Sequence, residues 1–190
     1  MDVILFHHAQ GLTDGVIALA DRLRAAGHTV HTPDLYEGRT FTDLDDGVSH
    51  ARDTGFGEII ERGVRAAEPL AGPAVYIGVS LGVLPAQRLA QTRADARGAV
   101  LLEACVPPAE LGTPWPPAVP VQIHGMDHDP SFAGEGDLDA ARALVEEAPA
   151  GELFLYPGDG HLFTDSSLPS YDDKATTQVV ERVLTFLARS

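Results

Sequence analysis

One stretch decides the fold of this chain: Ala74-Val75-Tyr76-Ile77-Gly78-Val79-Ser80-Leu81-Gly82. A short run of β-branched and aromatic residues ends in a Gly-x-Ser-x-Gly motif and passes directly into a helical pattern. This layout predicts a nucleophile elbow, a tight turn between a strand and a helix that exposes the serine hydroxyl. Glycines at 78 and 82 avoid a Cβ clash where the backbone on the two sides of the serine comes together. The helix from Leu81 would direct its N-terminal amides towards Ser80, where they can stabilise a developing oxyanion.

Partners for such a serine follow later in the chain. A serine nucleophile needs a base, and the base needs an acid that orients it. The apolar segment 119–124 precedes Asp127 and Asp129, and the segment 153–156 precedes a glycine-rich loop that ends in His161. The order serine, acid, histidine is the order found in α/β-hydrolases. The sequence therefore predicts Ser80 as nucleophile and His161 as base.

The remaining pattern alternates between strands and helices over a single expected domain, residues 1–190. This alternation predicts an α/β-hydrolase fold with a mostly parallel sheet of about six to seven strands and helices on both faces. Active sites in such sheets lie at the carboxyl ends of the strands. Residues 37–57 are expected to be an irregular excursion, and the proline-rich residues 106–118 a loop. The expected strands are 3–7, 29–32, 74–79, 98–102, 119–124 and 153–156, and the expected helices 14–26, 58–70, 81–92, 136–147 and 176–189.

Composition narrows the classes of partner. The net charge is −15, from 13 basic and 28 acidic residues, which argues against nucleic acids and anionic membranes as partners. No apolar run is long enough to span a bilayer, and the N-terminus lacks the basic region of a signal peptide. Cys105 is the only cysteine, so no internal disulfide can form. We expect a cytoplasmic protein; a homodimer is compatible with this sequence.

Four local patterns resemble the dienelactone hydrolase family of the α/β-hydrolase superfamily. They are the segments His7-His8-Ala9-Gln10-Gly11-Leu12, Pro33-Asp34-Leu35-Tyr36, the elbow, and Tyr156-Pro157-Gly158-Asp159-Gly160-His161-Leu162-Phe163. The resemblance covers nearly the whole chain. It implies a hydrolase in which the amides of Ala9 and Leu81 form the oxyanion hole. Its best-known members carry cysteine where this chain has Ser80, and a glutamate where it has His8.

The identity of the triad acid stays open between two aspartates. Asp129 precedes Pro130, as in the Gly-x-x-Asp-Pro arrangement common in the superfamily, and Asp127 lies two residues after Gly125, a spacing also seen in the family. We favour Asp129 and keep Asp127 as the alternative. His8 is expected to line the substrate pocket near Ser80.

A metal site is the competing interpretation of the histidines. His7, His8, His124 and His128 could bind a metal together with Asp127 and Asp129. Adjacent histidines at a strand end diverge, however, so this reading is disfavoured and no metal or cofactor is expected. The sequence thus predicts a serine hydrolase acting on a small-molecule ester or lactone. The alternatives are a non-catalytic binding module on the same fold and a metal-dependent hydrolase.

Overall fold

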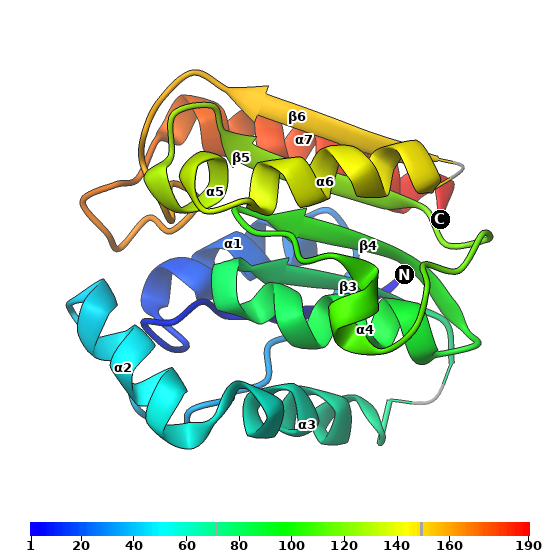
Figure 1. The fold of residues 1–190 in the computed structure, drawn as a ribbon, viewed down its shortest axis with the longest axis horizontal. Coiled ribbons are helices and arrows are strands. Elements are labelled where there is room, and N and C mark those ends of the chain that lie inside the picture. Colours follow the sequence, from blue (N-terminus) through cyan, green and yellow to red (C-terminus); the bar gives the residue numbers. More distant parts are fainter. Residues whose placement is uncertain (71, 149) are drawn as a thin grey trace.

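The computed structural model describes residues 1–70, 72–148 and 150–190, and a six-stranded sheet runs through its centre (Figure 1). Every neighbouring pair of strands is parallel, and the strand order is β2-β1-β3-β4-β5-β6. This arrangement confirms the predicted α/β-hydrolase fold class. The strands are β1 (Asp2–Phe6), β2 (Thr29–His31), β3 (Ala74–Val79), β4 (Ala96–Leu102), β5 (Val121–Met126) and β6 (Gly151–Tyr156).

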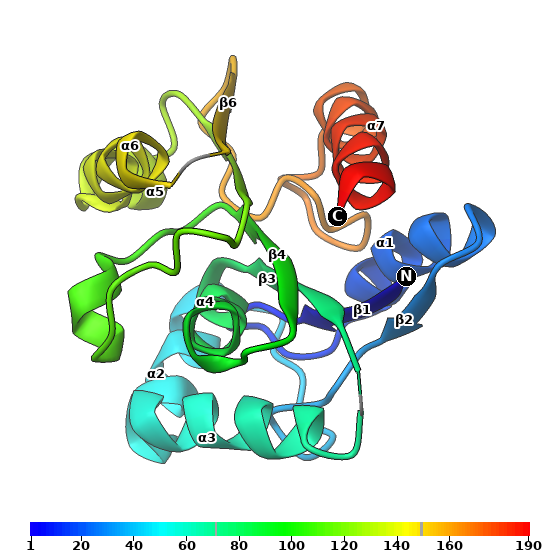
Figure 2. The ribbon, with the colours of Figure 1, turned by 90° about the vertical axis from the view of Figure 1, so that its right-hand side faces the viewer.

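Helices cover both faces of the sheet and bury two separate apolar layers (Figure 2). One layer joins the sheet to α1 and α7, and the other joins it to α3, α4 and α6. Alternate residues of each strand face opposite layers, as Val3 and Leu5 face α1 whereas Ile4 and Phe6 face the other side. The helices are α1 (Asp14–Ala25), α2 (Leu44–Thr54), α3 (Phe56–Ala67), α4 (Val83–Thr92), α5 (Pro130–Gly134), α6 (Asp137–Glu147) and α7 (Asp173–Arg189).

The prediction of irregular structure over residues 37–57 is wrong, because most of these residues are helical. Asp43 caps α2, its side chain accepting hydrogen bonds from the backbone amides of Asp45 and Asp46. Only Gly47 and Ala51 of this helix are buried, so its apolar stripe is too narrow to produce a visible helical period. The short helix α5 was also missed, although Asp129 followed by Pro130 is a helix-start signal.

No helix in the described ranges is both long enough and apolar enough to cross a membrane.

The turn after β3 has the geometry that the Gly-x-Ser-x-Gly motif predicts. Ser80 has a φ of 48°, in the left-handed region that a non-glycine residue rarely adopts. A Cβ built on Gly78 would lie 2.3 Å from the carbonyl oxygen of Gly82. A Cβ on Gly82 would lie 2.3 Å from the carbonyl oxygen of Phe6 on β1. The two glycines therefore let three backbone segments meet beneath the serine.

Gly82→Ala should destabilise the protein by about 2 kcal/mol or more, because the added methyl group meets a backbone carbonyl that cannot move independently of the sheet. Urea unfolding followed by circular dichroism measures this change. Gly57→Ala is the matched control, since Gly57 lies in α3 with nothing within 4 Å of the new Cβ. Alanine there should be neutral or stabilise the helix by up to about 1 kcal/mol. Equal unfolding midpoints for the two variants would contradict the packing described here.

Candidate active site

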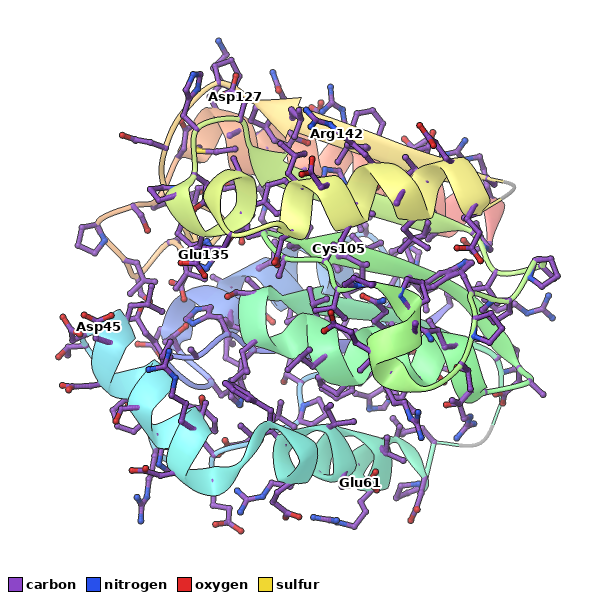
Figure 3. All side chains as sticks on the ribbon, in the orientation of Figure 1. Asp45, Glu61, Cys105, Asp127, Glu135 and Arg142 are labelled. Atoms are coloured by element: carbon purple, nitrogen blue, oxygen red, sulfur yellow. The ribbon has the colours of Figure 1, made fainter. Side chains whose placement is uncertain are left out.

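The predicted site residues come from loops that follow three strands of the sheet. Ser80 follows β3, Asp129 follows β5 and His161 follows β6. In Figure 1 the arrowheads of β4 and β6 point to one end of the molecule, and these loops belong to that end. Figure 3 shows Asp127 and Glu135 at the same end. The carboxyl ends of the strands therefore bring together residues that lie up to 81 positions apart in the chain.

Ser80, His161 and Asp129 form a continuous chain of hydrogen bonds. Ser80 Oγ lies 2.9 Å from His161 Nε2, and His161 Nδ1 lies 2.7 Å from Asp129 Oδ2. With Nδ1 donating to the carboxylate, a neutral imidazole has its acceptor, Nε2, towards the serine hydroxyl. The side chain of His161 is 13% exposed and that of Asp129 is fully buried. The arrangement can take a proton from Ser80 and stabilise the imidazolium that results.

Asp129 is held by the start of α5. Its Oδ1 accepts a hydrogen bond of 2.9 Å from the backbone amide of Ser131, which makes it the N-cap of this short helix. Pro130 occupies the first helical position, where its missing amide hydrogen has no consequence. One carboxylate oxygen is therefore fixed by the backbone, and the other is left for His161.

Asp127 is hydrogen-bonded to Gly158 and His128 and not to His161. Its Oδ1 accepts hydrogen bonds from the amide of Gly158 at 3.1 Å and from His128 Nδ1 at 2.6 Å. These two contacts lower the pKa of Asp127 below its ordinary value, and the bond from the Gly158 amide has the larger effect. Its backbone amide also bonds the carbonyl of Tyr156. Asp127 thus links the ends of β5 and β6, whereas Asp129 is the aspartate that contacts His161.

Surrounding carboxylates raise the pKa of His161. Burial alone would lower it, but the hydrogen bond that His161 donates to Asp129 and the negative charges of Glu103, Asp129 and Asp137 outweigh burial. The pKa of the imidazole therefore lies above 6.5, its usual value. A reaction that needs neutral His161 would accordingly become faster as the pH rises through this raised pKa.

The segments of Ala9 and Leu81 lie side by side above the sheet. Phe6 and Gly78 are paired in the β1–β3 register, so Ala9 and Leu81 both stand three residues beyond that pair. The backbone of Gly82 packs closely against the carbonyl oxygens of Phe6 and His7. Gly47 of α2 covers the Ala9 carbonyl, because a Cβ at residue 47 would meet that oxygen at 2.2 Å. The unpredicted helix α2 therefore packs on the loop proposed to carry an oxyanion donor.

His8 is fully buried, and both of its ring nitrogens have partners. Nε2 lies 2.7 Å from Asp165 Oδ2, and Nδ1 accepts a bond of 3.1 Å from the amide of Gln10. Asp165 also accepts hydrogen bonds from Thr13 and Ser167. These bonds outweigh the opposing effect of burial and lower the pKa of Asp165 to about 2. His8 consequently ties the loop after His161 to the loop after β1, with no surface left for a substrate.

The other histidines considered as metal ligands are dispersed among separate partners. His7 Nδ1 bonds the His8 carbonyl and Nε2 accepts from the amide of Leu35, while burial lowers the pKa of His7 to about 4. His124 bonds Tyr156 and Gln122, and burial lowers its pKa to about 3. Across residues 1–70, 72–148 and 150–190, no three His, Cys, Asp or Glu residues are grouped so as to hold a metal.

Sequence reasoning assigned no role to two acidic residues whose charges act on His161. Glu103 follows β4, is fully buried and adopts a φ of 65°. Asp137 at the start of α6 accepts a hydrogen bond of 3.0 Å from the amide of Cys105, and burial raises its pKa. The thiol of Cys105 is buried, and its pKa is raised to about 12. The position of Glu103 at a strand end was visible in the sequence, but its burial depends on the His161 loop folding over it.

A hollow of about 1020 Å³ lies at the amino ends of the strands, whereas Ser80 lies at their carboxyl ends. It is bordered by residues at the amino ends of β3 to β6 and by the end of α7, among them Pro73, Asp95, Pro120, Glu152 and Arg189. Ser80, Asp129 and His161 do not line this hollow.

The family model for the dienelactone hydrolase family matches residues 1–190. The chain belongs to the dienelactone hydrolase family. The resemblance drawn from the four sequence patterns is thereby confirmed, and the protein is a hydrolase. A search of curated protein sequences gives no match.

Solved structures of this family and of related proteins share the fold. The dienelactone hydrolase of Anabaena variabilis has a TM-score of 0.69 at 17% identity, covering 100% of this chain and 86% of its own. A dienelactone hydrolase-like promiscuous phosphotriesterase from metagenomic libraries has a TM-score of 0.75 at 18% identity, covering 99% and 85%. Est1E of Butyrivibrio proteoclasticus, solved with ferulic acid bound, has a TM-score of 0.67 at 16% identity, covering 98% and 89%. At such identities the likeness establishes the fold alone.

Proposed function

We propose that the protein is a serine hydrolase that cleaves a small ester or lactone through Ser80, His161 and Asp129. The observation that carries the proposal is the hydrogen-bonded chain from Ser80 Oγ through both nitrogens of His161 to the buried Asp129 carboxylate. The left-handed backbone at Ser80 supports it, because strain of this kind needs a compensating role.

Acylation begins with attack of Ser80 Oγ on the substrate carbonyl carbon while His161 Nε2 takes the hydroxyl proton. Asp129 remains ionised and stabilises the imidazolium through Nδ1. The amides of Leu81 and Ala9 are the proposed donors to the tetrahedral oxyanion. The intermediate then expels the alkoxide, which receives the proton from Nε2. In a lactone this alcohol stays attached to the acyl group.

Deacylation repeats the same steps with water as nucleophile. His161 Nε2 takes a proton from the water as its oxygen attacks the acyl carbon, and returns it to Ser80 Oγ as the acid leaves. No step requires a metal or an organic cofactor. The proposal also places the enzyme in the cytoplasm, in keeping with its single buried cysteine.

The two alternatives differ from this proposal in simple assays. A binding module of the same fold would release no p-nitrophenol from an activated ester, whereas a serine hydrolase should give a burst and then turnover. A metal-dependent hydrolase would lose activity to EDTA and regain it with Zn²⁺. A screen of p-nitrophenyl esters and simple lactones, with and without EDTA, separates all three.

Ser80→Ala should reduce kcat on p-nitrophenyl esters by about 10⁴- to 10⁶-fold, because the nucleophile is removed while the fold stays intact. Steady-state release of p-nitrophenol measures the loss, and circular dichroism verifies folding. Ser49→Ala serves as the control, because Ser49 is exposed on α2, and its rate should equal that of the unaltered enzyme. Undiminished turnover in Ser80→Ala would refute the proposed nucleophile.

Asp129→Asn should cost about 10⁴-fold in kcat, because the amide favours the wrong tautomer of His161. Asp127→Asn is the matched control on the same loop and should cost far less, since Asp127 bonds Gly158 and His128. Both rates come from the ester assay. The reverse ranking would transfer the acid role to Asp127, and two small losses would mean that neither aspartate is the triad acid.

A further inference from the structure

The carboxyl group of Glu103 is placed beneath the loop that carries His161. Its Oε1 accepts two hydrogen bonds from Thr164, one from the backbone amide at 3.2 Å and one from the hydroxyl at 3.0 Å. Thr164 is three residues after His161, so this pair of bonds attaches the histidine loop to the end of β4. The backbone amide of Glu103 in turn bonds the carbonyl of His124 on β5 at 2.7 Å.

The second carboxyl oxygen of Glu103 is buried and has no hydrogen-bond partner among the residues that the structure describes. A buried carboxyl oxygen without a partner costs free energy, and a tether to Thr164 through the other oxygen does not by itself require that cost. Glu103 also adopts a left-handed φ of 65°, which is unfavourable for a side chain of this kind. Two unfavourable features at one residue indicate a role beyond packing.

We propose that Glu103 is a positioning residue of the Ser80 site, which fixes the His161 loop through Thr164 and stabilises the protonated imidazole with its own negative charge. The inference rests on the proposed function. In the transition state for acylation His161 becomes an imidazolium, and Glu103 then supplies a second carboxylate besides Asp129. No proton transfer through Glu103 to the substrate is involved.

The pKa shifts of Glu103 and His161 agree with this role. Burial raises the pKa of Glu103 to about 7, the charge of His161 opposing and that of Asp129 adding to the effect. Three carboxylates raise the pKa of His161: Asp129 before α5, Asp137 on α6 and Glu103 after β4. Because each of the two groups shifts the pKa of the other, the titrations of His161 and Glu103 are coupled.

Glu103→Gln separates the charge from the tether, because the amide oxygen can still accept both bonds from Thr164. The pKa of His161, followed by NMR of ¹³C-labelled histidine, should fall by about half a unit or more. The pH midpoint of the acid limb of the kcat/KM profile, measured on a neutral ester, should fall by the same amount. The plateau at high pH should fall about three- to tenfold, since a weaker base is less effective.

Glu61→Gln is the matched control. Figure 3 shows Glu61 on α3, away from the end of the sheet where Asp127 and Glu135 lie. This variant should leave the His161 titration and the pH profile as in the unaltered enzyme. Thr164→Val tests the tether instead: it removes the hydroxyl donor to Glu103, and kcat should fall while KM stays nearly unchanged.

The unaltered protein provides a test that needs neither folding of a variant nor turnover. Its His161 titration curve should depart from a single ionisation, because His161 and Glu103 titrate as a coupled pair. A single ionisation at or below pH 6.5, or identical curves for Glu103→Gln and the parent, would overturn the inference. Both results are independent of the proposed function, which is tested separately by the turnover of Ser80→Ala.

Discussion

The close approach of three backbone segments at the end of β3 is the constraint on which this structure depends. Gly78 faces the carbonyl of Gly82, and Gly82 faces the carbonyl of Phe6 on the neighbouring strand. Side chains at either position would separate β1 from β3 and relax the turn that holds Ser80 in a left-handed conformation. The position of the serine relative to the Ala9 and Leu81 amides is thus determined by the sheet, before any substrate binds.

The loop that carries His161 depends on a second set of contacts, which come from three directions. Asp165 connects it to His8 after β1 and to Thr13 before α1, Thr164 connects it to Glu103 after β4, and His161 itself connects it to Asp129 after β5. Long loops are usually mobile, but buried polar contacts of this number restrict the imidazole to one orientation. Two of the acidic groups that make these contacts, Glu103 and Asp129, also raise the pKa of His161. These two residues therefore both support the loop and tune the base.

The sequence predicted the parts of the fold that have a strong local signal. Buried β-strands, the capped helix α1 and the elbow all follow from hydrophobic runs and glycine positions, and their bounds agree within a few residues. Helix α2 was missed because it buries only Gly47 and Ala51, and α5 because five residues give no period. His8 was expected in the pocket, but its burial depends on Asp165, which lies 157 positions later. Contacts between loops of different strands cannot be deduced from local patterns.

The most direct measurement of the central claim is covalent trapping of the nucleophile by a fluorophosphonate, analysed by intact mass and peptide mapping. The account predicts one equivalent of adduct, on Ser80, with fluoride as the leaving group and with labelling that slows as His161 becomes protonated. The adduct should form equally well in the presence of EDTA. Labelling of a different residue, or no labelling of an enzyme that still hydrolyses esters, would contradict the account.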